Sequence, residues 1–198
     1  LYGFCCSLLV LVSGCSLPLD FNMIEGSGIK ASERRSVAIF TAVEVVGSSN
    51  VEILVGGEQA ITVELDDNLI DLITTEVEGD TLVVSSSGSY STRMQGRVTV
   101  TVPALTRVSI MGSGDINAQG VNGRTFEASI QGSGDIVVTG QVVSLQVSVK
   151  GSGNADLSQL VVDEAAASVT GSGDIIVHAT AQLTANIIGS GDIRYSGG

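Results

Sequence analysis

Five Asp or Asn residues recur at a nearly constant interval in the second half of the chain, and they are the side chains best placed for shared chemistry. Each closes a Gly-Ser-Gly-Asp or Gly-Ser-Gly-Asn tetrad, and the tetrads begin 18 to 20 residues apart. Carboxylates stacked one strand apart, about 4.8 Å, would repel one another and could be neutralised by Ca²⁺. The tetrad positions are Gly112, Gly114 and Asp115; Gly132, Gly134 and Asp135; Gly151, Gly153 and Asn154; Gly171, Gly173 and Asp174; and Gly189, Gly191 and Asp192.

A structural role is the favoured interpretation of these tetrads. Asn154 interrupts the carboxylates, and the motif differs from the Gly-Gly-x-Gly-x-Asp repeat that binds calcium in parallel β-rolls. Asp and Asn readily bond to the backbone of their own turn, while Gly permits a positive φ or a close backbone approach. The tetrads also lack the Lys-Ser/Thr of a phosphate-binding loop. We therefore predict structural turns, no metal site and no cofactor.

The sequence contains no recognisable catalytic constellation. A glycosidase or lyase needs converging carboxylates, or a base beside Arg or Lys, on one outward patch. The outward positions near the tetrads have no carboxylate pair, and Glu127 with Lys150 or Arg107 is expected to form an ordinary surface ion pair. We predict a protein that is not an enzyme, with a carbohydrate-active enzyme as the alternative.

The first residues predict a lipoprotein leader. The apolar residues 8–12 are too few to span a membrane, which takes about 20 residues, but they suit the hydrophobic region of a signal peptide. Val12-Ser13-Gly14-Cys15 resembles a bacterial lipobox, in which the cysteine receives a diacylglyceryl group. We predict a signal peptide over 1–14, whose start precedes Leu1, and a lipidated Cys15. An ordinary signal peptide before a chance cysteine is the alternative.

Location and partners follow from the leader and the charge. Ser16 after the cysteine favours the outer membrane of a Gram-negative envelope. The other cysteines, Cys5 and Cys6, also lie in the leader, which excludes disulfides and a catalytic thiol from the rest of the chain. The net charge of -12 argues against nucleic acid as a partner.

Hydrophobic periodicity around the tetrads predicts the fold. Aliphatic residues alternate before each tetrad, as at Val108 and Ile110, and again after it, as at Ile116 and Ala118. A period of two predicts strands with one buried face. Each repeat is then a strand, a glycine turn, a second strand and a return loop, which is one coil of a solenoid. The predicted class is all-β, a right-handed parallel β-solenoid with 18 to 20 residues per coil.

The first half predicts more irregular β coils. Strand-forming segments separated by turn residues cover 40–46, 51–55, 60–65, 81–85 and 97–102, whereas 68–78 is compatible with helix or strand. The predicted organisation is a tether over 15–35 and one domain over 36–198, with the tetrad repeats starting near 103.

A row of small polar residues is the candidate binding face. Three positions before each tetrad stand Ser109, Ser129, Ser148, Ser168 and Asn186. Alternation turns these side chains outward, opposite to the aliphatic core.

The repeats, together with Phe40-Thr41-Ala42-Val43-Glu44-Val45 and Asn68-Leu69-Ile70, resemble the GIN-domain family over residues 26–198. These exported bacterial proteins are described as auto-transporter adhesin heads that form parallel β-helices. The resemblance implies an adhesin-like binding or scaffolding module whose partner is a glycan, a protein or further copies of itself, and the expected membrane anchor is the lipid on Cys15. A purely structural envelope lipoprotein is a further alternative.

Overall fold

The computed structural model describes residues 23–197. The predicted signal peptide, the lipidation site Cys15 and tether residues 15–22 lie outside the described residues. Strands dominate the fold, and the helical segment among the described residues is a single 3₁₀ turn, η1 (Ile70–Leu72). The predicted all-β class is confirmed.

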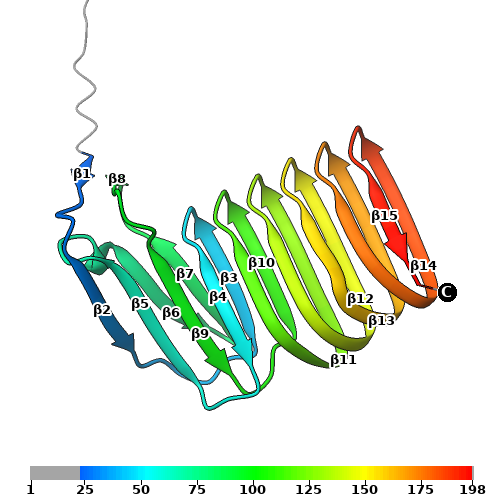
Figure 1. The fold of residues 1–198 in the computed structure, drawn as a ribbon, viewed down its shortest axis with the longest axis horizontal. Coiled ribbons are helices and arrows are strands. Elements are labelled where there is room, and N and C mark those ends of the chain that lie inside the picture. The colour runs from blue at the N-terminus through cyan, green and yellow to red at the C-terminus, as the bar shows by residue number, and fades with distance from the viewer. Residues whose placement is uncertain (1–22, 198) are drawn as a thin grey trace, which may run out of the picture.

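The C-terminal half is a stack of parallel coils that lie side by side along the long axis of the molecule (Figure 1). All neighbouring strands in this stack pair in parallel, and the first glycine of each tetrad stands opposite the first glycine of the next. The strands are β10 (Arg107–Gly112), β11 (Ile116–Gly132), β12 (Ile136–Gly151), β13 (Ala155–Gly171), β14 (Ile175–Gly189) and β15 (Ile193–Ser196).

Each long strand serves two coils, which differs from the predicted return loop. β11 leaves one tetrad as a second strand, bends, and reaches the next tetrad as a first strand. The register shifts at the bend, between Ala118 and Val121 on β11, so a bulge turns the strand without ending it. Gly120 and Gly140 have φ of +77° and +140° at these bends, a backbone region that favours glycine. Strand pairing thus continues around the corner.

The hydrophobic core lies between the two faces of the coils. The aliphatic residues before and after the first four tetrads are buried, among them Phe126, Ala128 and Ile130 on β11. Each fully buried Val, Leu or Ile stabilises the fold by roughly 1.5–3 kcal/mol relative to exposure. The predicted alternation of buried and outward residues therefore holds along the stack as far as the first half of β14, whereas Ala185 and Ile187 before the last tetrad are exposed.

One more tight coil precedes the tetrad repeats. β3 (Ala42–Gly47) pairs in parallel with β10, and β4 (Val51–Val55) pairs in parallel with β11. The residues between them are Ser48, Ser49 and Asn50, and Gly47 stands opposite Gly112 in the register. This turn is a further copy of the tetrad that the sequence reading missed, because Ser49 stands where the other copies have their second glycine.

The next coil toward the N-terminus has an opened turn. β7 (Thr81–Ser86) pairs in parallel with β3, and β9 (Arg97–Val102) pairs in parallel with β4. Residues 87–96 join these two strands and include β8 (Tyr90–Ser91). A longer segment therefore replaces the tight glycine turn at this level of the stack.

Antiparallel strands cover the N-terminal end of both faces. β6 (Ile73–Glu78) pairs with β7, and β5 (Ala60–Asp66) pairs with β9. β2 (Lys30–Arg35) pairs with β5, and β1 (Ile24–Glu25) pairs in parallel with β8. The predicted tether thus ends in a strand, because a polar segment suits an edge position with exposed sides. The ambiguous segment 68–78 contains η1 followed by β6.

Candidate functional site

The tetrad turns form a ladder of close backbone contacts. Gly112 and Gly132 have φ of +143° and +139°, and the carbonyl of Gly112 accepts hydrogen bonds from the N–H groups of Ser133 at 2.9 Å and Gly134 at 3.3 Å. A Cβ on Gly134 would lie 1.9 Å from the carbonyl oxygen of Gly114. Both glycines of a tetrad are therefore needed for the coils to approach, the first also for its backbone conformation.

The Asp and Asn side chains of the tetrads hold successive turns together. The Oδ1 of Asp115 accepts the N–H of Asp135 at 3.0 Å, and the Oδ1 of Asp135 accepts the N–H of Asn154 at 2.8 Å. The Oδ1 atoms of Asn154 and Asp174 accept the N–H groups of Asp174 and Asp192 in the same way. The first four of the five side chains thus bond to the next turn, not to their own turn as predicted.

The tetrad row does not form a cation cage. Between residues 23 and 197, no three His, Cys, Asp or Glu side chains are grouped in a way that could hold a metal ion. At the last turn, the guanidinium of Arg194 lies 3.3 Å from Asp192 and 3.6 Å from Asp174. This arginine offsets part of the negative charge there.

The serine row runs in register along the outer face of the first-strand sheet. Ser109, Ser129, Ser148, Ser168 and Asn186 occupy equivalent positions on β10, β11, β12, β13 and β14. Ser109 is 8% exposed and donates to Oε2 of Glu44 at 2.9 Å. The next three serines are half-buried and Asn186 is exposed. We call these five residues the serine row.

Longer side chains flank the serine row on both sides. Glu127 and Gln146 are exposed on one side, and Gln131 and Lys150 are exposed on the other. Ser129 and Ser148 are therefore recessed between longer polar side chains, whereas the flanks of the later coils carry short or apolar residues, Ala166, Thr170, Thr184 and exposed Ile188. A hollow of about 300 Å³ lies at the first of these flanks, lined in part by Arg107, Glu127 and Gln146.

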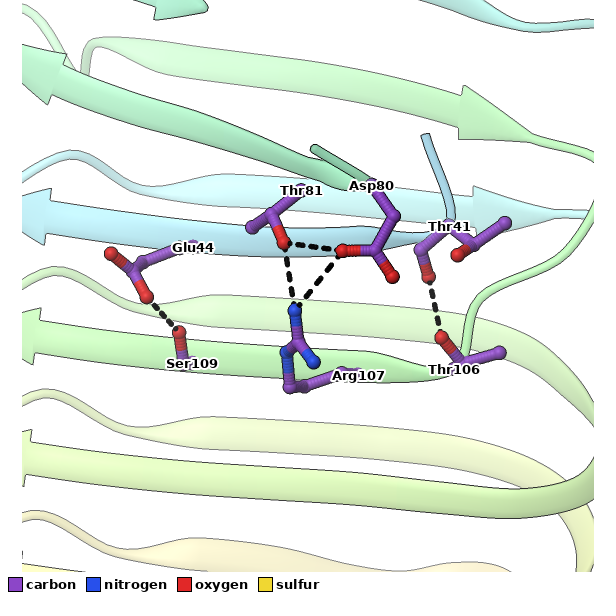
Figure 2. A network of polar contacts seen from close by, with 7 residues as sticks. All are labelled: Thr41, Glu44, Asp80, Thr81, Thr106, Arg107 and Ser109. Atoms are coloured by element: carbon purple, nitrogen blue, oxygen red, sulfur yellow. Dashed lines mark hydrogen bonds and ion pairs between the residues drawn. The ribbon is translucent and has the colours of Figure 1, made fainter. Parts of the chain in front are cut away.

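A polar network closes the N-terminal end of the serine row (Figure 2). Arg107 donates to Oγ1 of Thr81 at 2.7 Å and lies 3.4 Å from Asp80. The predicted pairing of Arg107 with Glu127 is therefore wrong, because the arginine reaches back across β3 to the start of β7. Sequence reasoning missed this network, since Asp80 and Thr81 lie outside the repeats.

A second network fixes the N-terminal segment to the opened turn. The carboxylate of Asp66 on β5 is shielded from solvent and accepts hydrogen bonds from the hydroxyl of Thr92 and from the N–H of Gly28, the latter at 2.6 Å. The Thr92 hydroxyl, aided by the Gly28 N–H, lowers the pKa of Asp66 below its ordinary value, although burial opposes the shift. Asp66 thus holds residues 26–28 and 87–96 in place as an ionised acid.

The family model described as "Putative auto-transporter adhesin, head GIN domain" matches residues 39–198. The chain belongs to this family. The resemblance read from the repeats is thereby confirmed, and the head GIN domain is described in the family as part of an adhesin, not of an enzyme. No protein with a curated description matches the chain.

Solved structures share the fold of this head GIN domain. A "putative adhesin" from Bacteroides fragilis has a TM-score of 0.67 at 21% identity, covering 87% of this chain and 99% of that chain. A "putative lipid binding protein" from Parabacteroides distasonis has a TM-score of 0.57 at 20% identity, with coverage of 87% and 99%. A "putative adhesin" from Parabacteroides merdae has a TM-score of 0.56 at 20% identity, with coverage of 89% and 92%.

The described part of the head GIN domain has no membrane-crossing helix. From residue 23 to residue 197, no helix reaches the length and apolar character that such a crossing requires.

Proposed function

We propose that the chain is a non-enzymatic binding module of the cell envelope, exported and held at a membrane by a lipid on Cys15. The lipobox-like residues before Cys15 support the anchor, and Ser16 favours the outer membrane. The family description as an adhesin head supports an extracellular or envelope location. Two or three acyl chains would hold the protein stably, at about 0.8 kcal/mol for each buried methylene.

The serine row is the surface that this proposal assigns to binding. The observation that best supports this assignment is the unbroken register of the row across five strands, on a scaffold whose turns are held together by hydrogen bonds. Rows one strand apart repeat about every 4.8 Å. Because Ser109 is buried and bonded to Glu44, the accessible part runs over three steps from Ser129 to Asn186, which gives about 14 Å of equally spaced hydroxyl and amide groups. Such a surface is preorganised, so binding orders few protein groups.

A neutral glycan chain is the partner class that this chemistry favours. The row carries hydroxyl and amide groups, which donate and accept hydrogen bonds without charge. Exposed Gln131 and Gln146 flank it and extend the same chemistry. The net charge of -12 disfavours polyanions, nucleic acid among them.

For the scaffold itself, we propose right-handed winding of the coils, which short connections between parallel strands favour.

A glycan and extracellular-matrix protein array tests this proposal with the full chain, run with and without Ca²⁺. We expect reproducible glycan hits that Ser148→Arg abolishes, because a long charged side chain would fill the recess between the flanking rows. Ser152→Arg is the matched control, since Ser152 lies in the turn of the same coil and is exposed away from the face. Light scattering against concentration tests self-association in parallel.

Other outcomes would contradict the proposal. Hits limited to matrix proteins would mean that the ligand is a protein and not a glycan. If the folded chain gives no hit and assembles with rising concentration, a structural envelope protein is favoured. Turnover of a bound polysaccharide would indicate an enzyme. Fractionation of cells that express Cys15→Ser tests the anchor, because a variant that stays in the membrane fraction would contradict lipidation at this residue.

A further inference from the structure

A cavity of about 420 Å³ lies between the first tight turn and the opened turn of the stack. Its buried wall includes the side chains of Val63, Leu65 and Val98. Its exposed rim includes Ser48 and Gln95, so the cavity opens to solvent on that side. The cavity is on the turn edge of the molecule and shares no residue with the serine row.

The cavity exists because one turn of the ladder is replaced by a longer segment. Residues 48–50 join β3 to β4, whereas residues 87–96 join the neighbouring strands β7 and β9. The strands on either side keep their register, with Val46 opposite Ser85 and Val51 opposite Val98. The additional backbone therefore moves away from the ladder at the turn and leaves a space where the preceding tight turn would lie.

The first tight turn presents unused backbone donors to this space. In the later turns, the two N–H groups after the first glycine donate to the preceding glycine carbonyl, as Ser113 and Gly114 do to Gly47. The third N–H donates to the preceding Asp or Asn side chain, as Asp115 does to Asn50. The corresponding N–H groups of Ser48, Ser49 and Asn50 have no acceptor within residues 23–197.

Ser49 adds a buried hydroxyl to these donors. The residue is 7% exposed, and its Oγ has no hydrogen-bond partner within the described part of the chain. A Cβ on Gly114, the equivalent residue of the next turn, would point at the carbonyl of Ser49 at 2.2 Å. The same geometry directs the Ser49 side chain toward the position of the preceding turn, which is the cavity. A buried hydroxyl without a partner favours a bound group that supplies one.

The charged groups of the cavity wall are already neutralised. Glu64 forms an ion pair with Lys30 at 2.9 Å, and Arg97 forms one with Glu52 at 2.9 Å. Tyr90 lies half-buried in the wall, and burial raises the pKa of its phenol, so the ring contributes as an uncharged surface. The wall therefore combines neutral hydrogen-bonding groups, one aromatic ring and aliphatic side chains.

We propose that this cavity binds one neutral sugar residue, whose oxygens accept the free N–H groups of the first tight turn and pair with the hydroxyl of Ser49. The volume is within the roughly 300–1,000 Å³ typical of small-ligand sites and exceeds what a simple ion needs. Sugars present both hydroxyl edges and apolar faces, which match the polar turn and the Tyr90 and aliphatic wall. The site would bind a single sugar residue, either free or at the end of a glycan, independently of the serine row.

Amide-detected NMR titration of the full chain tests the proposal with D-glucose, D-galactose, D-mannose and N-acetyl-D-glucosamine. We expect at least one sugar to bind at millimolar concentration or better and to shift the amides of Ser48, Ser49 and Asn50. Ser49→Gly, which introduces the glycine of the other turns, should weaken that binding about fivefold through one lost hydrogen bond. Ser133→Gly is the control, because the same change then falls in a later turn.

Four results would overturn the proposal. In the first, none of the four sugars shifts these amides at tens of millimolar. In the second, the shifts fall only on the serine row. In the third, the Ser49→Gly and Ser133→Gly variants bind the sugar with the same affinity as the wild-type chain. A parallel titration with sodium laurate separates sugar from acyl chain, and laurate binding in the cavity in place of sugar would also contradict it.

Discussion

The C-terminal stack and the N-terminal region use the same coil, but they differ at the turn edge. In the stack, every turn repeats glycines at two positions and an Asp or Asn at a third, and the coils lock together through backbone and side-chain hydrogen bonds. In the N-terminal region, Ser49 departs from the pattern, residues 87–96 open the next turn, and antiparallel strands cover the end. The repeat creates a rigid, periodic face, and departure from it creates a cavity.

The largest expected effect comes from a side chain placed inside the ladder of turns. Gly134→Val puts a Cβ 1.9 Å from the backbone oxygen of Gly114, so neighbouring coils must separate. We expect a loss of about 3 kcal/mol or more in the free energy of unfolding, measured by urea denaturation. Gly123→Ala is the control, because its Cβ would meet nothing within 4 Å. Equal stability of the two variants would show that the coils do not stack as described.

The second largest effect concerns the N-terminal region, where the contribution of Asp66 to stability should depend on pH. The folded-state pKa of Asp66 is below its ordinary value of 3.8, so its ionised form stabilises the fold at pH values above 3.8. That contribution declines as the pH falls from 3.8 through the folded-state pKa. We expect Asp66→Asn to be less stable than the wild-type chain at neutral pH and the difference to shrink in acid.

Urea denaturation across this pH range measures the difference. Asp71→Asn is the control, because Asp71 is exposed. A difference between Asp66→Asn and wild type that stays constant down to the most acidic pH would contradict the role of the ionised carboxylate.

The smallest effect concerns the side-chain contacts between turns in the stack. Asp135→Ala removes the acceptor for the backbone N–H and the side-chain Nδ2 of Asn154, at 2.8 Å and 3.0 Å. We expect a loss of about 1 kcal/mol in unfolding free energy, because both bonds are exposed to water. Ser152→Ala in the next turn should change stability little. A loss for Asp135→Ala that matches that of Gly134→Val would mean that side chains, not backbone approach, dominate the ladder.

Sequence alone predicts the stack well, because its information is periodic. Alternating aliphatic residues identify the buried face, and the paired glycines of each tetrad identify turns with a close backbone approach. The hydrogen-bond partner of Asp115 was harder to predict, since a spacing of 20 residues does not say whether the carboxylate bonds to its own turn or to Asp135. That choice depends on the three-dimensional stacking.

The N-terminal region was harder to read for physical reasons. A single substitution, Ser49 for glycine, hid the first turn, and the polar composition of 30–35 concealed a strand that pairs along one edge only. The partner of Arg107 also lies outside the repeats, on a strand that the register brings alongside β3. Non-repeating contacts of this kind leave no periodic signal in the sequence.

The most direct test of the proposed function uses ligand length. Calorimetric titration of the full chain with a size series of the neutral glycan found on the array measures how many coils take part in binding. We predict that affinity rises with each added sugar until the glycan covers the roughly 14 Å of the serine row from Ser129 to Asn186, and then stays constant. In the part of the binding that Ser148→Arg abolishes, an affinity that is already maximal for a single sugar would contradict recognition by the row.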